Sequence, residues 1–291
     1  MKSFSLFSIV LFFSTFCLAQ ADFPSLSPKG TISQTVGNTQ ISIEYERPAV
    51  RNRIIFGGLV PWNKVWRTGA GYCTKITFDK EVIVGGQSVA AGTYSLFTIP
   101  TPTQWTVILN SDVSLYGSYD YDSEKDVARF IVRPQTSQRF YETMTLDIDV
   151  VPNDAVIYFS WANIQISFPV QTTTDQEVRA YISQDLLTGT STDAEQYVLF
   201  AEYLLIHNLD FFHAIQLTDK SMELEETEYA YRIKMEILEK IGNTSEALEI
   251  ARKGKVFVEG REFGSELGKE RTITIWQEAI DRIQKQLDGD E

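Results

Sequence analysis

Apolar and polar residues alternate in short runs between residues 31 and 170 of this 291-residue chain. The runs are rich in β-branched and aromatic residues, and glycine, proline and asparagine separate them. Alternation with a period of two is typical of antiparallel strands that bury one face. The runs occupy residues 31–36, 40–46, 74–78, 81–84, 93–99, 104–109, 128–133, 143–151, 155–161 and 164–170. Because no helix-length pattern interrupts them, the sequence predicts an antiparallel β-sandwich or a flattened barrel.

One hairpin can be placed within this region from its turn residues. Gly85 and Gly86 follow the apolar run EVIV and precede QSVAAGTYSLF. Two-residue hairpin turns require backbone conformations that glycine adopts without steric cost. The sequence therefore predicts a tight turn at Gly85-Gly86.

The periodicity becomes helical beyond the stretch PVQTTTDQE. Two sets of apolar residues fall at helical spacing: Tyr197, Phe200, Ala201, Leu204 and Leu205, then Tyr231, Ile233, Ile237, Leu238 and Ile241. Gly242-Asn243 and Gly260 mark helix ends. We therefore predict a β-domain over residues 22–170, a linker over 171–176 and an α-helical domain over 177–291.

The helical part contains a weak internal repeat. LDFFHAIQLTDKS from Leu209 and GNTSEALEIARKG from Gly242 align at an offset of 33 residues, which matches Ala214 to Ala247. This offset resembles the tetratricopeptide-type helical hairpin, although the tryptophan of that signature is missing. The repeat predicts helical hairpins that offer a surface to a protein partner.

Charge is divided between the same two parts. The chain has a formal net charge of −13, of which residues 22–170 carry −2 and residues 171–291 carry −12. The strong acidity of the helical part favours solubility and disfavours binding to nucleic acid or to anionic lipid.

Residues 1–21 have the features of an export signal. Lys2 is the only charge, an apolar run extends from Phe4 to Leu18, and Ala19-Gln20-Ala21 offers a small-x-small cleavage site. An uncleaved membrane anchor is the alternative, but a spanning helix needs roughly 18–20 apolar residues. We expect cleavage, a periplasmic or extracellular location, and a mature chain that does not span a membrane. Cleavage removes Cys17 and leaves Cys73, which has no partner for an internal disulfide.

Several motifs in the β-region recur together in one known family. They are YERP (residues 45–48), R-x-x-FG (Arg53, Phe56 and Gly57), VPWNKVWRTGA (60–70), AGTYSLFTIP (91–100), WTVILN (105–110) and DVARF (126–130). With these motifs, residues 27–170 resemble the exported Bacteroidota family called domain of unknown function 2911. The resemblance carries over no activity. The chain departs from the family pattern at Gly71-Tyr72, after the RTGA motif, and at Ala162, where the family tends to have glutamate after the tryptophan.

The sequence excludes several kinds of catalytic site. His207 and His213 are the only histidines and both lie in the helical part, so a histidine-based triad or multi-histidine zinc site within the β-region is excluded. No nucleophile-elbow, zinc-protease, phosphate-loop or paired-cysteine motif is present. We predict no cofactor, and we interpret Cys73 as a buried structural thiol. A pair of carboxylates remains possible as glycosidase machinery.

The segment from Arg47 to Gly71 contains no acidic residue. Its basic residues are Arg47, Arg51, Arg53, Lys64 and Arg67. Guanidinium groups match carboxylates and phosphates, and Trp62 and Trp66 offer flat apolar walls. One hypothesis is a pocket for a small polar or anionic ligand, formed by Arg47, Arg53, Trp62, Trp66 and Arg67. The alternative is that the arginines form ion pairs with acids from elsewhere, such as Glu44, Glu46, Glu142 or Asp126, and that the tryptophans plug one end of the β-domain.

A second candidate is the acidic loop YGSYDYDSEKD over residues 116–126. Its acids are Asp120, Asp122, Glu124 and Asp126, and alternating oxygen ligands are typical of calcium loops. However, no glycine stands between the acids and no terminal bidentate glutamate follows. A solvated charged loop is therefore the stronger interpretation.

These observations favour a non-catalytic, exported binding or accessory module that uses the Arg47–Gly71 segment. A carboxylate-based carbohydrate hydrolase and a purely structural protein of cell-envelope assembly are the alternatives.

Overall fold

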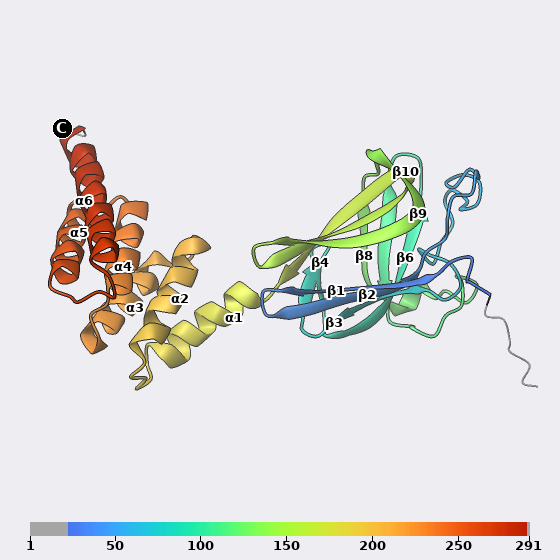
Figure 1. Cartoon of the computed structure of the whole chain (residues 1–291). Helices are drawn as coiled ribbons and strands as arrows, with labels where there is room; N and C mark the ends of the chain where they lie inside the picture. The colour runs from blue at the N-terminus through green and yellow to red at the C-terminus, as the bar shows by residue number, and fades with distance from the viewer. Residues whose placement is uncertain (1–22, 290–291) are drawn as a thin grey trace, which may run out of the picture.

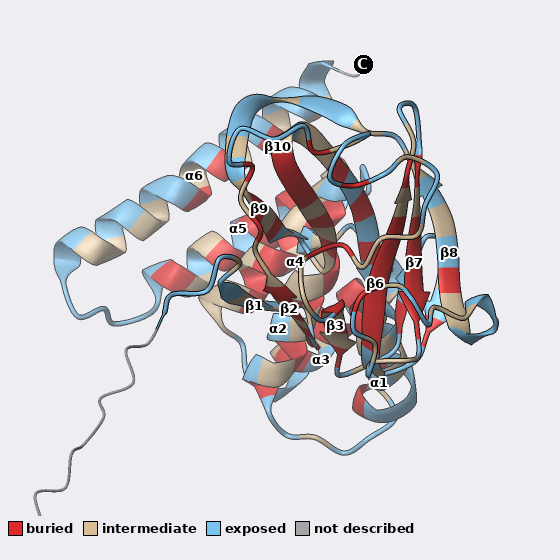
Figure 2. Ribbon diagram, turned by 90° about the vertical axis from the view of Figure 1, so that its right-hand side faces the viewer, coloured by how far each residue is buried: buried red, intermediate tan, exposed pale blue. Residues whose placement is uncertain are grey.

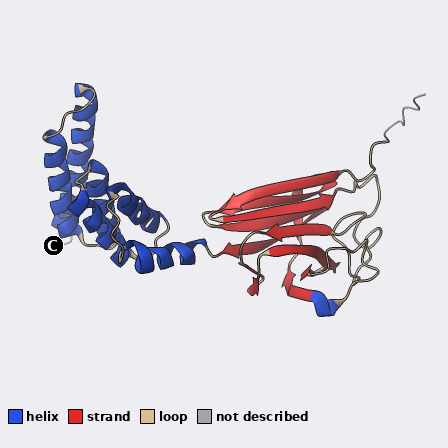
Figure 3. Ribbon diagram, turned by 90° about the horizontal axis from the view of Figure 1, so that it is seen from below, coloured by secondary structure: helices blue, strands red, loops and turns tan. Residues whose placement is uncertain are grey.

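The computed structural model describes residues 23–289, so the predicted export signal lies outside the described residues. A β-region and a helical region lie side by side, and helix α1 (Thr174–Tyr181) connects them (Figure 1). Viewed from below, the strands occupy one end of an elongated molecule and the helices occupy the other (Figure 3). The chain therefore combines an antiparallel β-region with a C-terminal helical region, as the sequence predicted.

The first sheet contains six strands in the order β1-β2-β3-β6-β7-β8. Their bounds are β1 Lys29–Val36, β2 Thr39–Glu46, β3 Thr74–Phe78, β6 Gly92–Pro100, β7 Trp105–Asn110 and β8 Asp126–Val132. Every neighbouring pair is antiparallel. Strand β2 has the predicted alternation: Ile41, Ile43 and Tyr45 are buried, and the residues between them are half-exposed.

The second sheet contains four strands in the order β5-β4-β10-β9. Their bounds are β4 Val82–Val84, β5 Gln87–Val89, β9 Gln135–Val151 and β10 Asp154–Thr172. Gly85 and Gly86 join β4 to β5 with φ of 59° and 77°, which confirms the tight turn predicted at these glycines.

The runs predicted over 155–161 and 164–170 belong to one strand, β10. The register with β9 shifts on both sides of Ala162, whose φ is 52°. A β-bulge at this position interrupts the alternation without ending the strand. Strand β10 continues to Thr172 and α1 begins at Thr174, so most of the stretch predicted as a linker is regular structure.

Residues from both sheets form one hydrophobic core (Figure 2). Its largest fully buried side chains include Trp105 from β7 and Phe159, Trp161 and Phe168 from β10. Burial of such aromatic side chains contributes about 1.5–3 kcal/mol each. The finer prediction of a β-sandwich stays a prediction.

The helical region contains α1 and five further helices within residues 23–289. Their bounds are α2 Ala194–Ile206, α3 Phe211–Leu224, α4 Glu228–Lys240, α5 Thr244–Glu259 and α6 Glu266–Gly289, and a π-helical turn over Ile182–Leu186 extends α1. Most of the predicted apolar stripes is confirmed, because Tyr197, Ala201 and Leu204 are buried in α2 and Ile233, Ile237 and Leu238 are buried in α4. Ile241 was wrongly included, since α4 ends at Lys240 and Ile241 is 43% exposed. The tetratricopeptide-like interpretation stays a prediction.

The helix ends follow local chemistry. Asp193 and Thr227 precede α2 and α4, and their side chains accept hydrogen bonds from the backbone N–H groups of Gln196 and Ala230 at 3.1 Å each. Gly260 caps α5, as its place in the sequence predicted. Among residues 23–289, no helix combines the length and the apolar character that a membrane span requires.

Polar contacts connect the two regions where α1 begins. The Asn38 backbone N–H, in the β1–β2 turn, donates to Thr174 Oγ1 at 2.9 Å, and Lys80 forms an ion pair with Glu177 at 2.7 Å. The Asn153 side chain, in the β9–β10 turn, donates to Asp175 at 2.6 Å. Tyr203 of α2 donates to the same carboxylate, and burial followed by this hydrogen bond raises the pKa of Tyr203.

We expect Phe159→Ala to lower the free energy of unfolding of the β-region by about 3–5 kcal/mol, because it removes a buried ring and leaves a cavity. Urea unfolding followed by near-UV circular dichroism measures the change. Phe212→Ala is the matched control, since Phe212 is 69% exposed and its loss is expected to cost less than about 0.5 kcal/mol. Equal losses in the two variants would contradict the assignment of Phe159 to the core.

Candidate functional site

The basic segment lies at the end of the β-region that faces away from the helices. The turn between β1 and β2 contacts α1 through Asn38 and Thr174, so β2 runs away from the helical region and ends at Glu46. The segment continues from that end, among the blue loops of the β-region (Figure 1). A site on this segment is therefore far from the acidic helices.

Backbone hydrogen bonds attach the segment to both sheets. The N–H of Val50 donates to the Glu142 carbonyl of β9 at 2.7 Å. Trp66 and Thr98 of β6 exchange two backbone hydrogen bonds of 2.8 and 2.9 Å. Val50, Ile55 and Val60 are buried in the shared core. The segment is thus part of the folded β-region rather than a free loop.

A cluster of aromatic rings lies beneath the segment. The indoles of Trp66 and Trp161 stack with centroids 5.8 Å apart and planes inclined by 19°. Phe56 contacts both edge-on, at 6.2 and 6.1 Å, and contacts Trp105 at 4.7 Å. Edge-to-face and offset-stacked rings gain about 0.5–1.5 kcal/mol per pair beyond their buried area. These contacts hold Trp66, and with it Arg67, against strand β10.

Buried threonines fix the backbone beside Arg67. Thr68 is fully buried and has a φ of 51°, a conformation that is rare for a β-branched residue. Its hydroxyl lies 3.1 Å from that of Thr98, and its carbonyl accepts a 2.6 Å hydrogen bond from Thr74. The indole N–H of Trp66 donates to the Gly69 carbonyl at 3.1 Å. Arg67 therefore projects from a backbone held on both sides.

Unusual backbone conformations concentrate around this segment. Of seven non-glycine residues with positive φ among residues 23–289, five lie here: Arg51, Asn52, Asn63, Thr68 and Ala162. Each such conformation costs of order 1–3 kcal/mol and persists where the surrounding structure enforces it, often at functional sites. The fold thus holds these residues in backbone conformations that non-glycine residues seldom adopt.

Three arginines line one cavity of about 310 Å³, which we call the arginine cavity. Arg51, Arg53 and Arg67 contribute the charges, Trp66 and Trp161 contribute indoles, and no aspartate or glutamate is among the described residues that line it. The lining of the cavity is therefore positively charged, although the whole chain has a net negative charge, most of which lies in the helical region.

The guanidinium groups of these arginines form no ion pair within residues 23–289. Arg51 donates to the Leu26 carbonyl at 2.7 Å, and Arg53 donates to the Val50 carbonyl at 3.0 Å. The described structure therefore does not contain the ion pairs that the alternative hypothesis predicted for these three arginines. Backbone oxygens orient the guanidinium groups of Arg51 and Arg53, and none of the three guanidinium groups forms an ion pair with a carboxylate among residues 23–289.

Two buried N–H groups of residues that line the arginine cavity lack a hydrogen-bond partner among the described residues. They are Arg67 Nε and Trp161 Nε1. Buried donors are almost always hydrogen-bonded in folded proteins, and an unsatisfied one costs about 1–3 kcal/mol.

A second cavity of about 500 Å³ adjoins the first at Arg53, which lines both, and we call it the apolar cavity. Its apolar walls include Ile54, Phe56, Trp62 and Phe140. Trp62 stacks on Phe56 with centroids 6.1 Å apart. Gly57 lies against the Trp62 indole with a φ of 84°, and any side chain at Gly57 would overlap that ring.

The structure brings most, though not all, of the predicted ligand-binding residues together. Arg53, Trp66 and Arg67 line the arginine cavity, and Trp62 lines the apolar cavity. Arg47 lines neither: its Nε donates to the Met144 carbonyl and its Nη2 to Thr145 Oγ1, both at 3.0 Å. Arg47 thus joins the end of β2 to β9.

One charged and one aromatic residue of the arginine cavity, Arg51 and Trp161, were not among the predicted binding residues. Arg51 stands in the same acid-free segment, and that signal was available in the sequence. Trp161 stands in a run that alternates like a strand, so the sequence predicted only a core position for it. In the structure it is 1% exposed. The bulge at Ala162 is absent from any local pattern, and it alters how β10 presents Trp161 and Ala162 to the two cavities.

Two of the four carboxylates of the acidic loop form hydrogen bonds within the protein. Asp122 caps a short 3₁₀ turn by accepting from the Glu124 N–H at 2.9 Å. Asp126 accepts from Asn110 at 2.9 Å and from Tyr121 at 2.7 Å, while Asp120 and Glu124 are exposed. Burial, followed by this Asp126 contact, raises the pKa of Tyr121 to about 12. Within residues 23–289, no group of three or more His, Cys, Asp or Glu side chains is placed to hold a metal ion.

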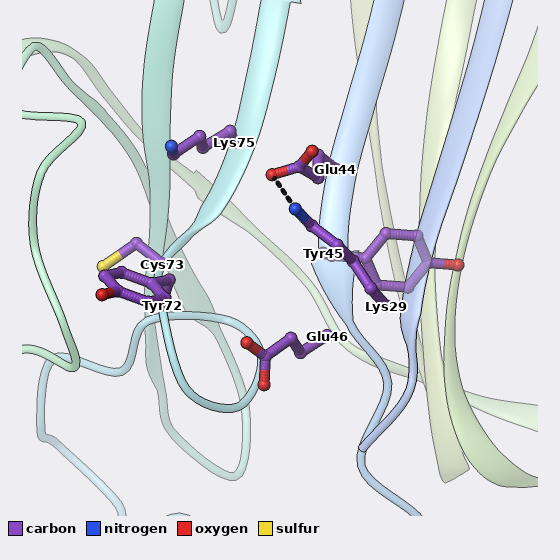
Figure 4. Close-up of a pocket in the computed structure, with 7 residues that line it drawn as sticks. All are labelled: Lys29, Glu44, Tyr45, Glu46, Tyr72, Cys73 and Lys75. Carbon is purple, nitrogen blue, oxygen red and sulfur yellow. Dashed lines mark ion pairs between the residues drawn. The ribbon is translucent and has the colours of Figure 1, made fainter. Parts of the chain in front are cut away.

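A third cavity, of about 310 Å³, has mixed charge (Figure 4). It opens where the pairing of β2 with β3 ends at Glu44 and Lys75. Glu44 forms a 2.8 Å ion pair with Lys29, and Glu46 extends from β2 with Tyr72 and Cys73 across from it (Figure 4). The backbone of Gly71 packs against the Glu46 carboxylate with a φ of 56°, so the glycine that departs from the resembled family pattern is required here sterically.

Cys73 is 4% exposed, and its thiol donates to the Gly117 carbonyl at 3.0 Å. Burial raises the pKa of Cys73 to about 11, an effect that the Arg67 charge only partly offsets. Since the thiolate is the nucleophile, this residue is unsuited to nucleophilic chemistry at neutral pH.

Comparisons with known proteins agree with the resemblance of the β-region. A family model described as "Protein of unknown function (DUF2911)" matches residues 27–170. No curated protein and no solved structure matches the chain.

Substitution of Arg47 and of Arg67 by methionine tests which of the two arginines stabilises the fold and which is free for a ligand. Arg47→Met is expected to lower the free energy of unfolding by about 1.5–3 kcal/mol, since it removes charged hydrogen bonds to β9. Arg67→Met keeps the apolar stem and removes an unsatisfied buried donor, so it is expected to leave the free energy of unfolding unchanged or to raise it. Chemical denaturation of both variants measures the difference, and a larger loss for Arg67→Met would contradict this division.

The thiol of Cys73 is expected to react slowly with a disulfide reagent in the folded protein. With a pKa of about 11, only about one thiol in a thousand is ionised at pH 8. Absorbance during reaction with a chromogenic aromatic disulfide measures the rate, and unfolding in guanidinium is the control that should restore fast labelling. Rapid labelling of the folded protein would show that Cys73 is accessible and ionised.

Proposed function

Residues 27–170 belong to the DUF2911 family, whose description assigns no activity, and we propose that this chain binds a small anion in the arginine cavity. The anion carries a carboxylate or phosphate group. The chain then acts as a non-catalytic binding module, and its predicted export signal places this module in the periplasm or outside the cell.

One observation carries the proposal: three arginines surround one cavity without a carboxylate among its described lining residues. Like charges held close together repel one another, and the fold retains them here without the neutralising acids that a structural network would use. A bound anion would remove that repulsion and would accept charge-assisted hydrogen bonds from the guanidinium groups.

The unsatisfied donors give the anion further partners. Arg67 Nε and Trp161 Nε1 belong to different segments, and both residues line the arginine cavity. An oxygen of the ligand within reach of these atoms would satisfy them without a change of fold. The stacked Trp66 and Trp161 rings support a preformed wall, which lowers the ordering cost of binding.

The lining favours binding over catalysis. No histidine, cysteine, aspartate or glutamate is among the described residues of the arginine cavity, and Glu142 of the adjoining apolar cavity already accepts a hydrogen bond from the Arg51 backbone N–H. In the mixed-charge cavity Glu44 and Glu46 offer two carboxylates, but Glu44 is engaged there by Lys29. Two cavities of the helical region are also lined by several glutamates each.

The helical region supports an accessory role. Its negative charge and its exposed apolar residues, such as Ile206 and Val256, suit contact with a protein partner. We propose that the helices dock such a partner while the opposite end of the β-region binds the anion.

Titration calorimetry of the protein with inorganic phosphate, acetate and sulfate tests anion binding. Arg67→Met is expected to weaken the affinity at least tenfold, because a hydrogen bond to a charged group contributes about 1.5–3 kcal/mol. Raised ionic strength should also weaken binding through screening.

Arg133→Met is the matched control, since Arg133 is exposed and lines neither cavity. It removes the same charge from the same region and is expected to leave the affinity within about twofold of the original, as expected for a screened distant charge. Absence of binding to all three anions, or equal losses in both variants, would overturn the proposal.

A further inference from the structure

We propose that the ligand is an amphipathic anion, with its charged group in the arginine cavity and an aliphatic or aromatic part in the apolar cavity. This inference rests on the proposed function and adds the chemical class of the ligand. The ligand is a free molecule in solution rather than the surface of a lipid bilayer.

The two cavities form adjoining parts of one surface. Arg53 lines both of them, and its neighbours in the chain divide between them: Arg51 faces the arginine cavity and Asn52 and Ile54 line the apolar one. The same division occurs in β10, where Trp161 lines the first cavity and Ala162 the second. A ligand bound at Arg53 therefore has access to both.

The apolar cavity contains large apolar side chains that solvent reaches. Ile54 is 77% exposed and Phe140 is 58% exposed, and they come from different segments. Apolar surface that is exposed and gathered around a concavity marks a binding surface more often than isolated exposed residues do. An apolar group seated between Ile54 and Phe140 would remove this surface from water.

The charges of the two cavities orient the ligand. The apolar cavity contains one carboxylate, Glu142, whose Oε1 accepts a 2.8 Å hydrogen bond from the Arg51 backbone N–H. A second anion placed beside Glu142 would be repelled, whereas the arginine cavity is lined by three arginines and no described carboxylate. The anionic group is therefore directed into the arginine cavity and the apolar part away from it.

Calorimetry with acetate, butanoate, hexanoate and octanoate below their micelle-forming concentrations tests this arrangement. Affinity is expected to rise about fourfold per buried methylene group, which corresponds to the transfer of about 0.8 kcal/mol from water. Ile54→Ser and Phe140→Ser should reduce this dependence on chain length and leave phosphate affinity within twofold, while Arg67→Met should weaken every member by a similar factor. Ile131→Ser is the matched control, because Ile131 is 62% exposed and lines neither cavity.

The outcomes distinguish this inference from the proposed function. If phosphate and acetate bind through Arg67 but affinity does not rise with chain length, the amphipathic ligand is wrong and anion binding stands. If chain-length dependence persists in both serine variants, the apolar cavity is not the site. If no anion binds, the proposed function itself fails. Co-sedimentation with fatty-acid-containing liposomes, without binding of free octanoate, would overturn the assignment to a soluble ligand.

Discussion

The contact between the Trp66 and Trp161 rings is the interaction on which the site depends. It joins a loop that follows β2 to a strand near the end of the β-region, across almost a hundred residues of sequence. Phe56, Trp105 and Phe159 surround the pair, so the loop is packed as core rather than as a mobile connection. Because the hydrophobic packing holds the backbone, the loop can keep several residues at positive φ and can present arginines without neutralising carboxylates. The stability of the aromatic cluster thus compensates for a polar arrangement that is unfavourable by itself.

Arginine has two distinct uses at this end of the β-region. Arg47 connects β2 to β9 through a carbonyl and a hydroxyl, and this is a structural role that requires no ligand. Arg51 and Arg53 also donate to carbonyls but line a cavity, and Arg67, which lines the same cavity, retains a buried donor without a described partner. A carbonyl orients a guanidinium without cancelling its charge, whereas a carboxylate would do both. This difference is what allows a positively charged site in a strongly acidic chain.

In the helical region, by contrast, basic side chains form ion pairs with carboxylates. Ion pairs such as Lys234–Asp219 at 2.5 Å and Arg282–Glu239 at 2.8 Å connect helices there, and in each of them one side chain is exposed and the other is largely buried. The junction with the β-region is polar and includes Asn153, Asp175 and Tyr203. The β-region contains one large hydrophobic core and a small cluster of Cys73, Phe97 and Ile108, and the helical region contains two cores. The proposed anion site and a partner-binding surface on the helices would therefore lie on separately packed units.

The sequence by itself determined the elements, because strand alternation, helical spacing and glycine turns are local properties of the chain. The stripes at Tyr197–Leu204 and the turn at Gly85-Gly86 required nothing beyond neighbouring residues. It also identified Arg53, Trp66 and Arg67 as members of one acid-free segment. Only the tertiary structure decided that these residues share a cavity with Arg51 and Trp161, that Arg47 serves a different purpose, and that no described carboxylate neutralises the three guanidinium groups. It also decided that the two runs predicted on either side of Ala162 form one strand, which has a bulge at that residue. These outcomes depend on contacts between residues far apart in the chain, such as Val50 with Glu142 and Trp66 with Thr98, which no local pattern encodes.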